Sequence, residues 1–323
     1  IMYRKTEGNP FFAIELIKNL KAHKYITIES KTEVTVDLKN IKKEPVSDNV
    51  VEVLIDNLSL LAEEDKKSLF IGAALGNRFS KNTHKHLFET LETSPYPDLQ
   101  FLVDEGLIIR VDINEFVFSH DRIQEAAYSL YDSEKKESLH FTIAGLLEEQ
   151  TKEDHLFEIV DHYNKSLSLV QTPDEKMHLA ELFLEAGKKA RSQGAFSEAL
   201  DFFSRGIDFL PEDSWERFYD LSFELSFGKA ESLYINSEHD KAEIILHDMY
   251  NKTQKKYQKG EIAELLLQLY CISSKYLKAI TYANEVLKEF DITIPEKITN
   301  EIIENYKFKL DNMLAEKGIE NIQ

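Results

Sequence analysis

Histidine is the first residue type in this sequence to test for metal chemistry. His84 and His86 lie close together on a polar segment with helical spacing, and His155 and His162 lie two helical turns apart. A zinc site needs four ligands arranged around one point, and neither pair has a cysteine partner. We therefore expect no metal site.

Paired carboxylates are equally weak evidence for catalysis. Glu63-Glu64 and Glu148-Glu149 have the pattern of a solvated helix face, so we assign them no acid or base role. A G-x-x-x-x-G-K-[ST] phosphate loop does not occur, and "IGAALGNRF" has two glycines in an apolar run with helical spacing but no lysine. We therefore expect no enzymatic activity and no bound cofactor in this chain itself.

His120 has the most specific local context of the histidines. It follows a short β-like run and opens the helical stretch "HDRIQEAAYSLY". Ser119 can cap that helix, the unpaired N–H groups at its start favour an anion, and an imidazole can donate to a phosphate oxygen. The alternative is a histidine that only packs at a helix entrance.

The amino-terminal stretch "EGNPFFAIELIKNL" is an apolar helix with a clear start. Asn9 can accept a backbone N–H as the cap, and Pro10 fits the first helical position. One apolar stripe follows at helical spacing and contains Phe12, Ala13, Leu16, Ile17 and Leu20. Because few residues precede this stripe and the sequence starts with Ile1, we expect a piece of a longer protein with a larger body upstream.

Composition places the chain among folded proteins of more than one core. It has 323 residues, of which 42% are hydrophobic and 30% charged. No signal peptide is recognisable, no apolar run approaches the roughly 18 residues of a membrane span, and Cys271 is a lone thiol, so we expect a cytoplasmic protein. The formal charge of −19 disfavours nucleic acid as a partner and favours solubility.

The first part of the chain mixes helices with two short hairpins. "KYITIES" and "EVTVDL" alternate as strands, and "KNIKKEPVSDN" is a polar linker. Residues 50–91 have helical spacing, and a helix containing "PDLQFLVDEGL" ends at Gly106. "LIIRVD" and "EFVFS" then form a hairpin joined by Ile113 and Asn114. Three helices followed by a two-stranded hairpin is the order of a winged helix.

The remainder is predicted to be helical. The expected helices cover about 134–150, 154–169, 174–193, 196–209, 214–236, 238–254, 260–273, 276–289 and 298–314. A tetratricopeptide register fits this part, with small residues where two antiparallel helices approach closely. The expected packing positions are Gly187, Ala190, Gly194, Ala199, Phe203, Gly206, Ala230, Ala242, Tyr270 and Ala279. Ala199, Ala242 and Ala279 lie 43 and 37 residues apart, so the array is irregular, and Ser237 and Ser274 stand where the turn glycine belongs.

The predicted fold class is therefore mainly α, a winged-helix domain with a small β-hairpin followed by an α-α solenoid of tetratricopeptide-like repeats. A stack of helix pairs leaves a long concave face that suits a peptide or another domain. A solenoid that serves only as a structural spacer is the alternative.

An ordered set of motifs resembles the carboxyl-terminal arm of the signal-transduction ATPases called STAND. The motifs are "KTEGNPFFAIELIKNL", "IDNLSLLAEEDKKSLFIGAALGNRF", "LVDEGLI", "FVFSHDRIQEAAYSL" and "LHFTIAGLLEE". They are more narrowly similar to the version in large bacterial multidomain kinases, which join a protein kinase, an ATPase, GAF sensors and a histidine kinase of two-component systems. This resemblance implies that residues 1–44 are the remnant of an ATPase lid, 45–153 a winged-helix domain and 154–323 the repeat domain.

The resemblance also implies two nucleotide contacts, which would form only in the full-length protein with ATP or ADP. Pro10 falls on the Gly-x-Pro motif of the lid, whose proline lies against adenine. His120 falls on the His-Asp motif of the winged helix, whose histidine reaches a phosphate. Asn57 stands where many relatives carry arginine, so that polar contact is not available here.

The function expected from these features is a non-catalytic regulatory and protein-interaction module. Its partners would be a protein or peptide on the concave face of the repeats and an upstream ATPase domain of the same chain, with neither nucleic acid nor a membrane involved. A winged-helix DNA-binding regulator is the second hypothesis. It is disfavoured because the third helix, "YPDLQFLVDEGL", carries Asp98, Asp104 and Glu105 and no basic residue.

Overall fold

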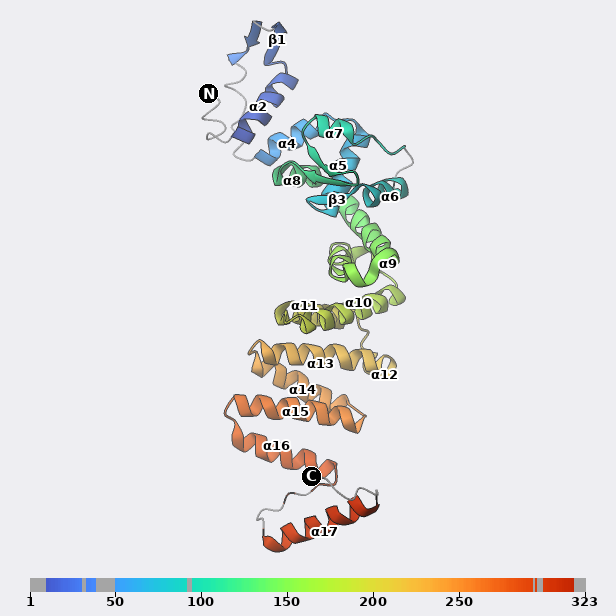
Figure 1. Ribbon diagram of the computed structural model, residues 1–323, viewed down its shortest axis with the longest axis vertical. Coiled ribbons are helices and arrows are strands. Elements are labelled where there is room, and N and C mark those ends of the chain that lie inside the picture. Colours follow the sequence, from blue (N-terminus) through green and yellow to red (C-terminus); the bar gives the residue numbers. More distant parts are fainter. Residues whose placement is uncertain are drawn as a thin grey trace. The chain divides into compact units, whose positions relative to one another are not determined.

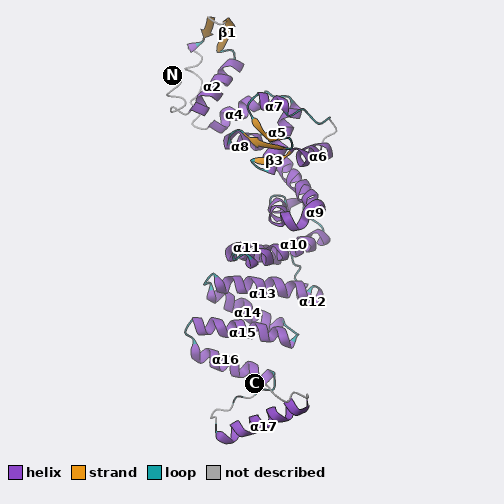
Figure 2. Ribbon diagram, in the orientation of Figure 1, coloured by secondary structure: helices purple, strands orange, loops and turns teal. Residues whose placement is uncertain are grey.

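A computed structural model of the chain describes residues 10–30, 33–38, 50–91, 95–292, 294 and 299–316. The protein is mainly helical, with a few short strands in its first half (Figures 1 and 2). The chain divides into two compact units, Ile1–Lys176 and Met177–Gln323. Among the described residues, no helix has both the length and the apolar character needed to cross a membrane.

The first unit begins with a helix and a hairpin. Helix α2 (Pro10–Ala22) is followed by β1 (Ile26–Ser30) and β2 (Glu33–Val36), which pair antiparallel with Ile26 opposite Val36. Both the helix and the hairpin were expected from the sequence and are confirmed. Leu20 at the end of α2 is fully buried, α2 contacts α4, and the Lys18 Nζ donates to the Glu105 carbonyl at 3.3 Å. The Phe12 side chain lies outside the described part of the chain.

A helical group with a three-stranded sheet forms the centre of the first unit. Its elements are α4 (Val50–Ser59), α5 (Glu63–Leu75), β3 (Arg78–Ser80), α6 (Lys81–Leu91), α7 (Gln100–Asp104), β4 (Ile108–Asp112), β5 (Glu115–Phe118) and α8 (Asp121–Ser129). Its core joins helices and sheet through buried side chains that include Leu54, Leu58, Leu69, Leu102, Phe116 and Ile123. The predicted hairpin of β4 and β5 is confirmed.

The sheet has a third strand that the sequence pattern did not predict. Residues 78–80 lie in a stretch that we expected to be helical throughout, yet they form β3 and pair antiparallel with β5, giving the order β3-β5-β4. Gly76, with φ of 127°, ends α5 just before this strand. Three residues are too few to show the side-chain alternation typical of a strand. Only their pairing with the distant residues 115–117 makes them one.

Helix α9 (Ser133–Asn164) is assigned as continuous but folds back on itself. His140 Nδ1 lies 2.7 Å from His162 Nδ1, although 22 residues of straight helix would span about 33 Å. The Tyr163 hydroxyl likewise donates to Glu148 at 3.2 Å. Two arms of α9 are therefore antiparallel, and the ribbon changes direction in Figure 1.

This reversal agrees with the two helices expected at 134–150 and 154–169, but their ends differ. The second arm ends at Asn164 and is followed by a 3₁₀ turn, η1 (Leu167–Leu169), rather than continuing as α-helix to residue 169. The expected domain boundary between residues 153 and 154 lies inside the α9 hairpin, whereas the two compact units meet between Lys176 and Met177.

The second unit is a series of helix pairs. The helices are α10 (Pro173–Ser192), α11 (Phe196–Asp208), α12 (Ser214–Arg217), α13 (Tyr219–Ile235), α14 (His239–Lys252), α15 (Lys256–Ile272), α16 (Tyr276–Glu289) and α17 (Asn300–Glu316). The single helix expected over 214–236 is wrong, because Phe218, with φ of −129° and ψ of 48°, separates α12 from α13. The expected start of α15 at residue 260 is also late by four residues.

The pairs α10–α11, α13–α14 and α15–α16 share one turn geometry. Gly194, Ser237 and Ser274 have φ values of 79°, 64° and 57°, which confirms that the two serines occupy the glycine position. In each turn the next residue donates its N–H to a carbonyl five residues earlier, at 2.8–3.0 Å. This is the Schellman arrangement that satisfies the last carbonyls of a helix. The short helix α12 lies between the first two pairs and lengthens the spacing between Ala199 and Ala242.

Candidate functional site

The predicted repeat positions lie where helices of the second unit meet. Ala190, Ala199, Phe203, Ala230, Ala242, Tyr270 and Ala279 are all buried, Gly187 and Gly206 lie in buried helix interiors, and Gly194 is the turn residue. The tightest point surrounds Phe203. A Cβ on Gly187 would stand 2.5 Å from the Phe203 ring, and one on Gly228 would stand 2.6 Å from it. The aromatic ring thus requires glycine on both neighbouring helices.

The first helices of the pairs, α10, α13 and α15, are linked by ion pairs between exposed or half-buried side chains. Lys188 and Arg191 of α10 pair with Glu224 and Glu231 of α13. The Lys255 Nζ, next to the start of α15, lies 2.5 Å from Asp220 of α13. These three contacts place the charged sides of neighbouring first helices on one surface, which we call the first-helix face.

The first-helix face carries more acid than base. On α10, Glu185 and Glu181 are exposed one and two turns before Lys188, and Glu261 is exposed on α15. The basic side chains at 188, 191 and 255 are each paired with an acid of α13.

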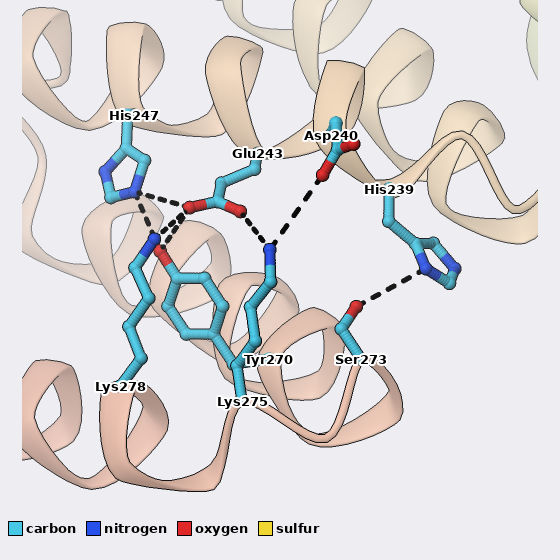
Figure 3. Close-up of polar contacts among 8 residues, drawn as sticks. All are labelled: His239, Asp240, Glu243, His247, Tyr270, Ser273, Lys275 and Lys278. Atoms are coloured by element: carbon cyan, nitrogen blue, oxygen red, sulfur yellow. Dashed lines mark hydrogen bonds and ion pairs between the residues drawn. The ribbon is translucent and has the colours of Figure 1, made fainter.

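Glu243 is the centre of a second polar cluster, between α14 and the α15–α16 pair (Figure 3). Its carboxylate accepts from Lys275 at 3.2 Å, from the Tyr270 hydroxyl at 3.2 Å and from Lys278. The His247 Nε2 lies 2.8 Å from the Tyr270 oxygen. Only 15% of the Glu243 side chain is exposed, so this is a mostly buried carboxylate held by two ammonium groups.

Electrostatics favour the charged form of this carboxylate. Burial by itself raises the pKa of Glu243, but the hydrogen bonds from Lys278 and Lys275 outweigh it and leave the pKa lowered. Burial and the neighbouring Glu243 charge raise the pKa of Tyr270, which therefore stays protonated. The cluster fastens the turn after α15 to α14, and its chemistry is that of an ion-paired clamp rather than of acid–base catalysis.

His120 caps α8 with its own ring. Its Nδ1 accepts the Arg122 N–H at 3.1 Å, which requires a ring that is unprotonated at Nδ1 and carries its proton on Nε2. The expected capping role of Ser119 is wrong, because that hydroxyl donates to the Gly106 and Leu107 carbonyls at 2.6 and 3.1 Å. Asn77 donates to Asp121 at 2.8 Å and ties the start of α8 to the residue before β3.

Pro10, the other residue with an implied nucleotide contact, begins α2 in the structure. Its side chain and the preceding Gly8 and Asn9 lie outside the described part of the chain. The contact of Pro10 with a nucleotide therefore stays a prediction, as does that of His120.

The far end of α8 leads into a buried chain of hydrogen bonds. The Tyr128 oxygen lies 2.8 Å from His140 Nε2, and His140 Nδ1 lies 2.7 Å from His162 Nδ1. Both histidines are buried, and burial lowers both pKa values, that of His140 to about 4. With neutral rings, His140 donates through one ring nitrogen and accepts through the other, so the hydrogen bonds run continuously from Tyr128 to His162. Helix α8 thus has His120 at its start and a link to both arms of α9 at its end.

The Glu243 cluster and the histidine chain are the polar sites that sequence reasoning missed. Glu243 stands next to the predicted packing residue Ala242, but a glutamate at this spacing is usually a solvated helix residue. His162 was considered only with His155, which instead bonds Glu158 at 2.8 Å. Among the described residues, no group of three or more His, Cys, Asp or Glu side chains is placed to hold a metal ion.

Comparisons with known proteins give limited likenesses. No protein-family model matches the chain. Over its whole length the chain is 22% identical to a part of the hybrid signal transduction histidine kinase G of Dictyostelium discoideum, and it spans 11% of that protein. Among solved structures, it has a likeness to a signal transduction ATPase with numerous domains (STAND) protein with a tetratricopeptide repeat sensor from Pyrococcus horikoshii. That likeness has 13% identity and a TM-score of 0.34, and it covers 88% of this chain and 49% of the other.

Proposed function

We propose that this chain is a non-catalytic regulatory and protein-interaction module of a larger signal-transduction ATPase or kinase. Residues 50–129 act as a winged helix that reports the nucleotide state of an ATPase domain in the same protein. Helix pairs after residue 176 bind a protein or peptide. The ordered STAND-like motifs and the similarity to a part of a hybrid signal transduction histidine kinase support this reading.

The observation that carries the proposal is the placement of two polar sites at opposite ends of α8. His120 at its start caps the helix through Nδ1, and an imidazole N–H is chemically able to donate to a phosphate oxygen. Tyr128 in its last turn is bonded to His140 of α9. A nine-residue helix spans about 13 Å, so movement imposed on His120 is transmitted through a rigid element to the α9 hairpin.

The binding side of the module is the first-helix face. Its ion-paired helices form a preformed charged surface with an acidic excess, which suits a segment rich in lysine or arginine from a protein partner. In the proposed mechanism, a partner bound to this face changes how readily the ATPase leaves its nucleotide-bound resting state.

The test uses the full-length protein and measures the dissociation rate of bound ADP together with ATP hydrolysis. His120→Ala should speed ADP release several-fold, whereas His155→Ala, a half-buried histidine bonded to Glu158 on α9, should not. Removing residues 177–323 should change the ATPase or kinase output. If His120→Ala and the deletion leave release and output at the wild-type values, the proposal is wrong.

A second measurement separates this function from catalysis by the chain alone. Because the sequence has no phosphate loop, ADP should not raise the melting temperature of the isolated chain. A rise that grows with ADP concentration would instead indicate a complete nucleotide site within these residues.

A further inference from the structure

An open apolar groove lies between the last two paired helices, α15 and α16. It has a volume of about 360 Å³ and is lined by Gly260, Ala263, Glu264, Leu267, Ala283, Val286, Leu287, Phe290 and Ile292. Nearly all of these side chains are apolar. Apolar surface of this kind gains free energy when another apolar element covers it.

The same positions in the preceding helix pairs are covered. In the first pair, Phe203 and Gly206 correspond to Ala283 and Val286, counted from the turn residues Gly194 and Ser274. Helix α13 covers that site, since a Cβ on Gly206 would stand 2.5 Å from Leu225. In the second pair, the corresponding Leu246 and Met249 are buried in a cluster with residues of α15. Each groove is thus filled by the first helix of the next pair.

Helix α17 has the dimensions of such a first helix. It contains 17 residues, as α13 and α15 do, and it follows a 14-residue helix as α15 does. Ten residues, 290–299, separate it from α16, and ten residues, 209–218, separate α13 from α11. The spacing that carries α13 onto the first groove is therefore repeated for α17.

Most apolar residues of α17 form one stripe, and most members of this stripe are exposed. Its members are Ile302, Ile303, Tyr306, Leu310, Met313 and Leu314, which fall within about 120° of the helix circumference. Leu310 is 55% exposed and Met313 57%. Phe308 lies on the opposite side of the helix. A 17-residue helix is marginal in water unless its apolar side is packed.

We infer that α17 docks its apolar stripe into the groove between α15 and α16, as the first helix of a fourth unit of the array. The occupant of the groove is thus a segment of the same chain. Docking covers the apolar groove beside α16 and places the polar side of α17 in line with the first-helix face.

Amide hydrogen exchange of the full chain tests this inference. In the wild type, α17 should be protected, and Leu310→Asp in the stripe should reduce that protection about tenfold or more. Ala283→Asp in the groove should have the same effect on α17, whereas Phe308→Asp should have none. The inference would be overturned by unprotected α17 amides in the wild type, or by α17 protection that is the same in Ala283→Asp as in the wild type.

A disulfide measurement distinguishes this chain's own α17 from that of a second copy. In a Cys271→Ser background, Leu287→Cys combined with Leu310→Cys should oxidise to a monomeric cross-linked species, and Leu287→Cys with Phe308→Cys should not. A cross-linked dimer as the main product, or protection of α17 that appears only at high protein concentration, would show that a second copy fills the groove and would refute intramolecular docking.

Discussion

His140 and His162 are in direct contact, with their Nδ1 atoms 2.7 Å apart, although they are 22 positions apart on α9. One Nδ1 must donate and the other accept, so the pair needs at least one neutral ring. Around it, the Tyr128 hydroxyl, Lys165 and Asp161 act on His140, and Lys165, Glu158 and Asp161 act on His162. Contact of the two rings holds the arms of α9 together and ties them to α8.

The first prediction is a loss of stability at mildly acid pH. Burial lowers the pKa of His140 to about 4, below the ordinary value of 6.5, so the unfolded chain binds a proton that the folded chain does not. The unfolding free energy should therefore fall as pH drops from about 6.5 to about 4, by up to about 1.4 kcal/mol per pH unit for this histidine. Buried His84, whose pKa is also lowered to about 4, adds to the same slope.

Urea unfolding at several pH values measures this slope. His140→Gln should flatten the pH dependence of the unfolding free energy. An equal slope in the His140 variant and the wild type would contradict the assignment.

The second prediction concerns the glycines around Phe203. Gly187→Ala puts a Cβ 2.5 Å from the ring and should lower the unfolding free energy by about 1–3 kcal/mol. Gly145→Ala is the matched control, because it lies within α9 with no atom within 4 Å of the added Cβ. There alanine should stabilise by about 0.5–1 kcal/mol. Phe203→Leu should reduce the penalty of Gly187→Ala in a double-mutant cycle.

The third prediction follows from the two serines in left-handed turn positions. Ser237→Gly and Ser274→Gly should each raise the melting temperature, because glycine adopts φ near 60° without the steric cost of a Cβ, about 1 kcal/mol. Ser204→Gly, inside α11, should lower it. If Ser237→Gly and Ser204→Gly shift the melting temperature in the same direction, the turn geometry assigned to residue 237 is wrong.

The fourth prediction concerns the Glu243 clamp. Glu243→Gln removes the charge that two lysines share in a mostly buried site and should cost about 1–3 kcal/mol of unfolding free energy. Asp248→Asn on the same helix breaks an exposed pair with Lys252 and should change stability by less than about 0.5 kcal/mol. Thermal unfolding of both variants at neutral pH decides between a clamp and an ordinary surface pair.

Helical periodicity and turn chemistry were readable from the sequence because they depend on neighbouring residues. The spacing of Ala199, Ala242 and Ala279 predicted the helix pairs, and the same register predicted Ser237 and Ser274 as turn residues. The capping role of the residues before α8 was not predicted correctly. Ser119 and His120 are both capable of it, and only the carbonyls of residues 106 and 107, which hold the serine hydroxyl, decide between them.

The sequence by itself determined the mainly helical character, the two hairpins, the register of the helix pairs and the lack of a phosphate loop. Each of these depends only on the local spacing of residues or on residue type. Tertiary structure decided the third strand β3, the contact between the arms of α9, the Glu243 clamp and the open groove beside α16. Each of these joins residues far apart in sequence, and its energy exists only once other elements have packed against it.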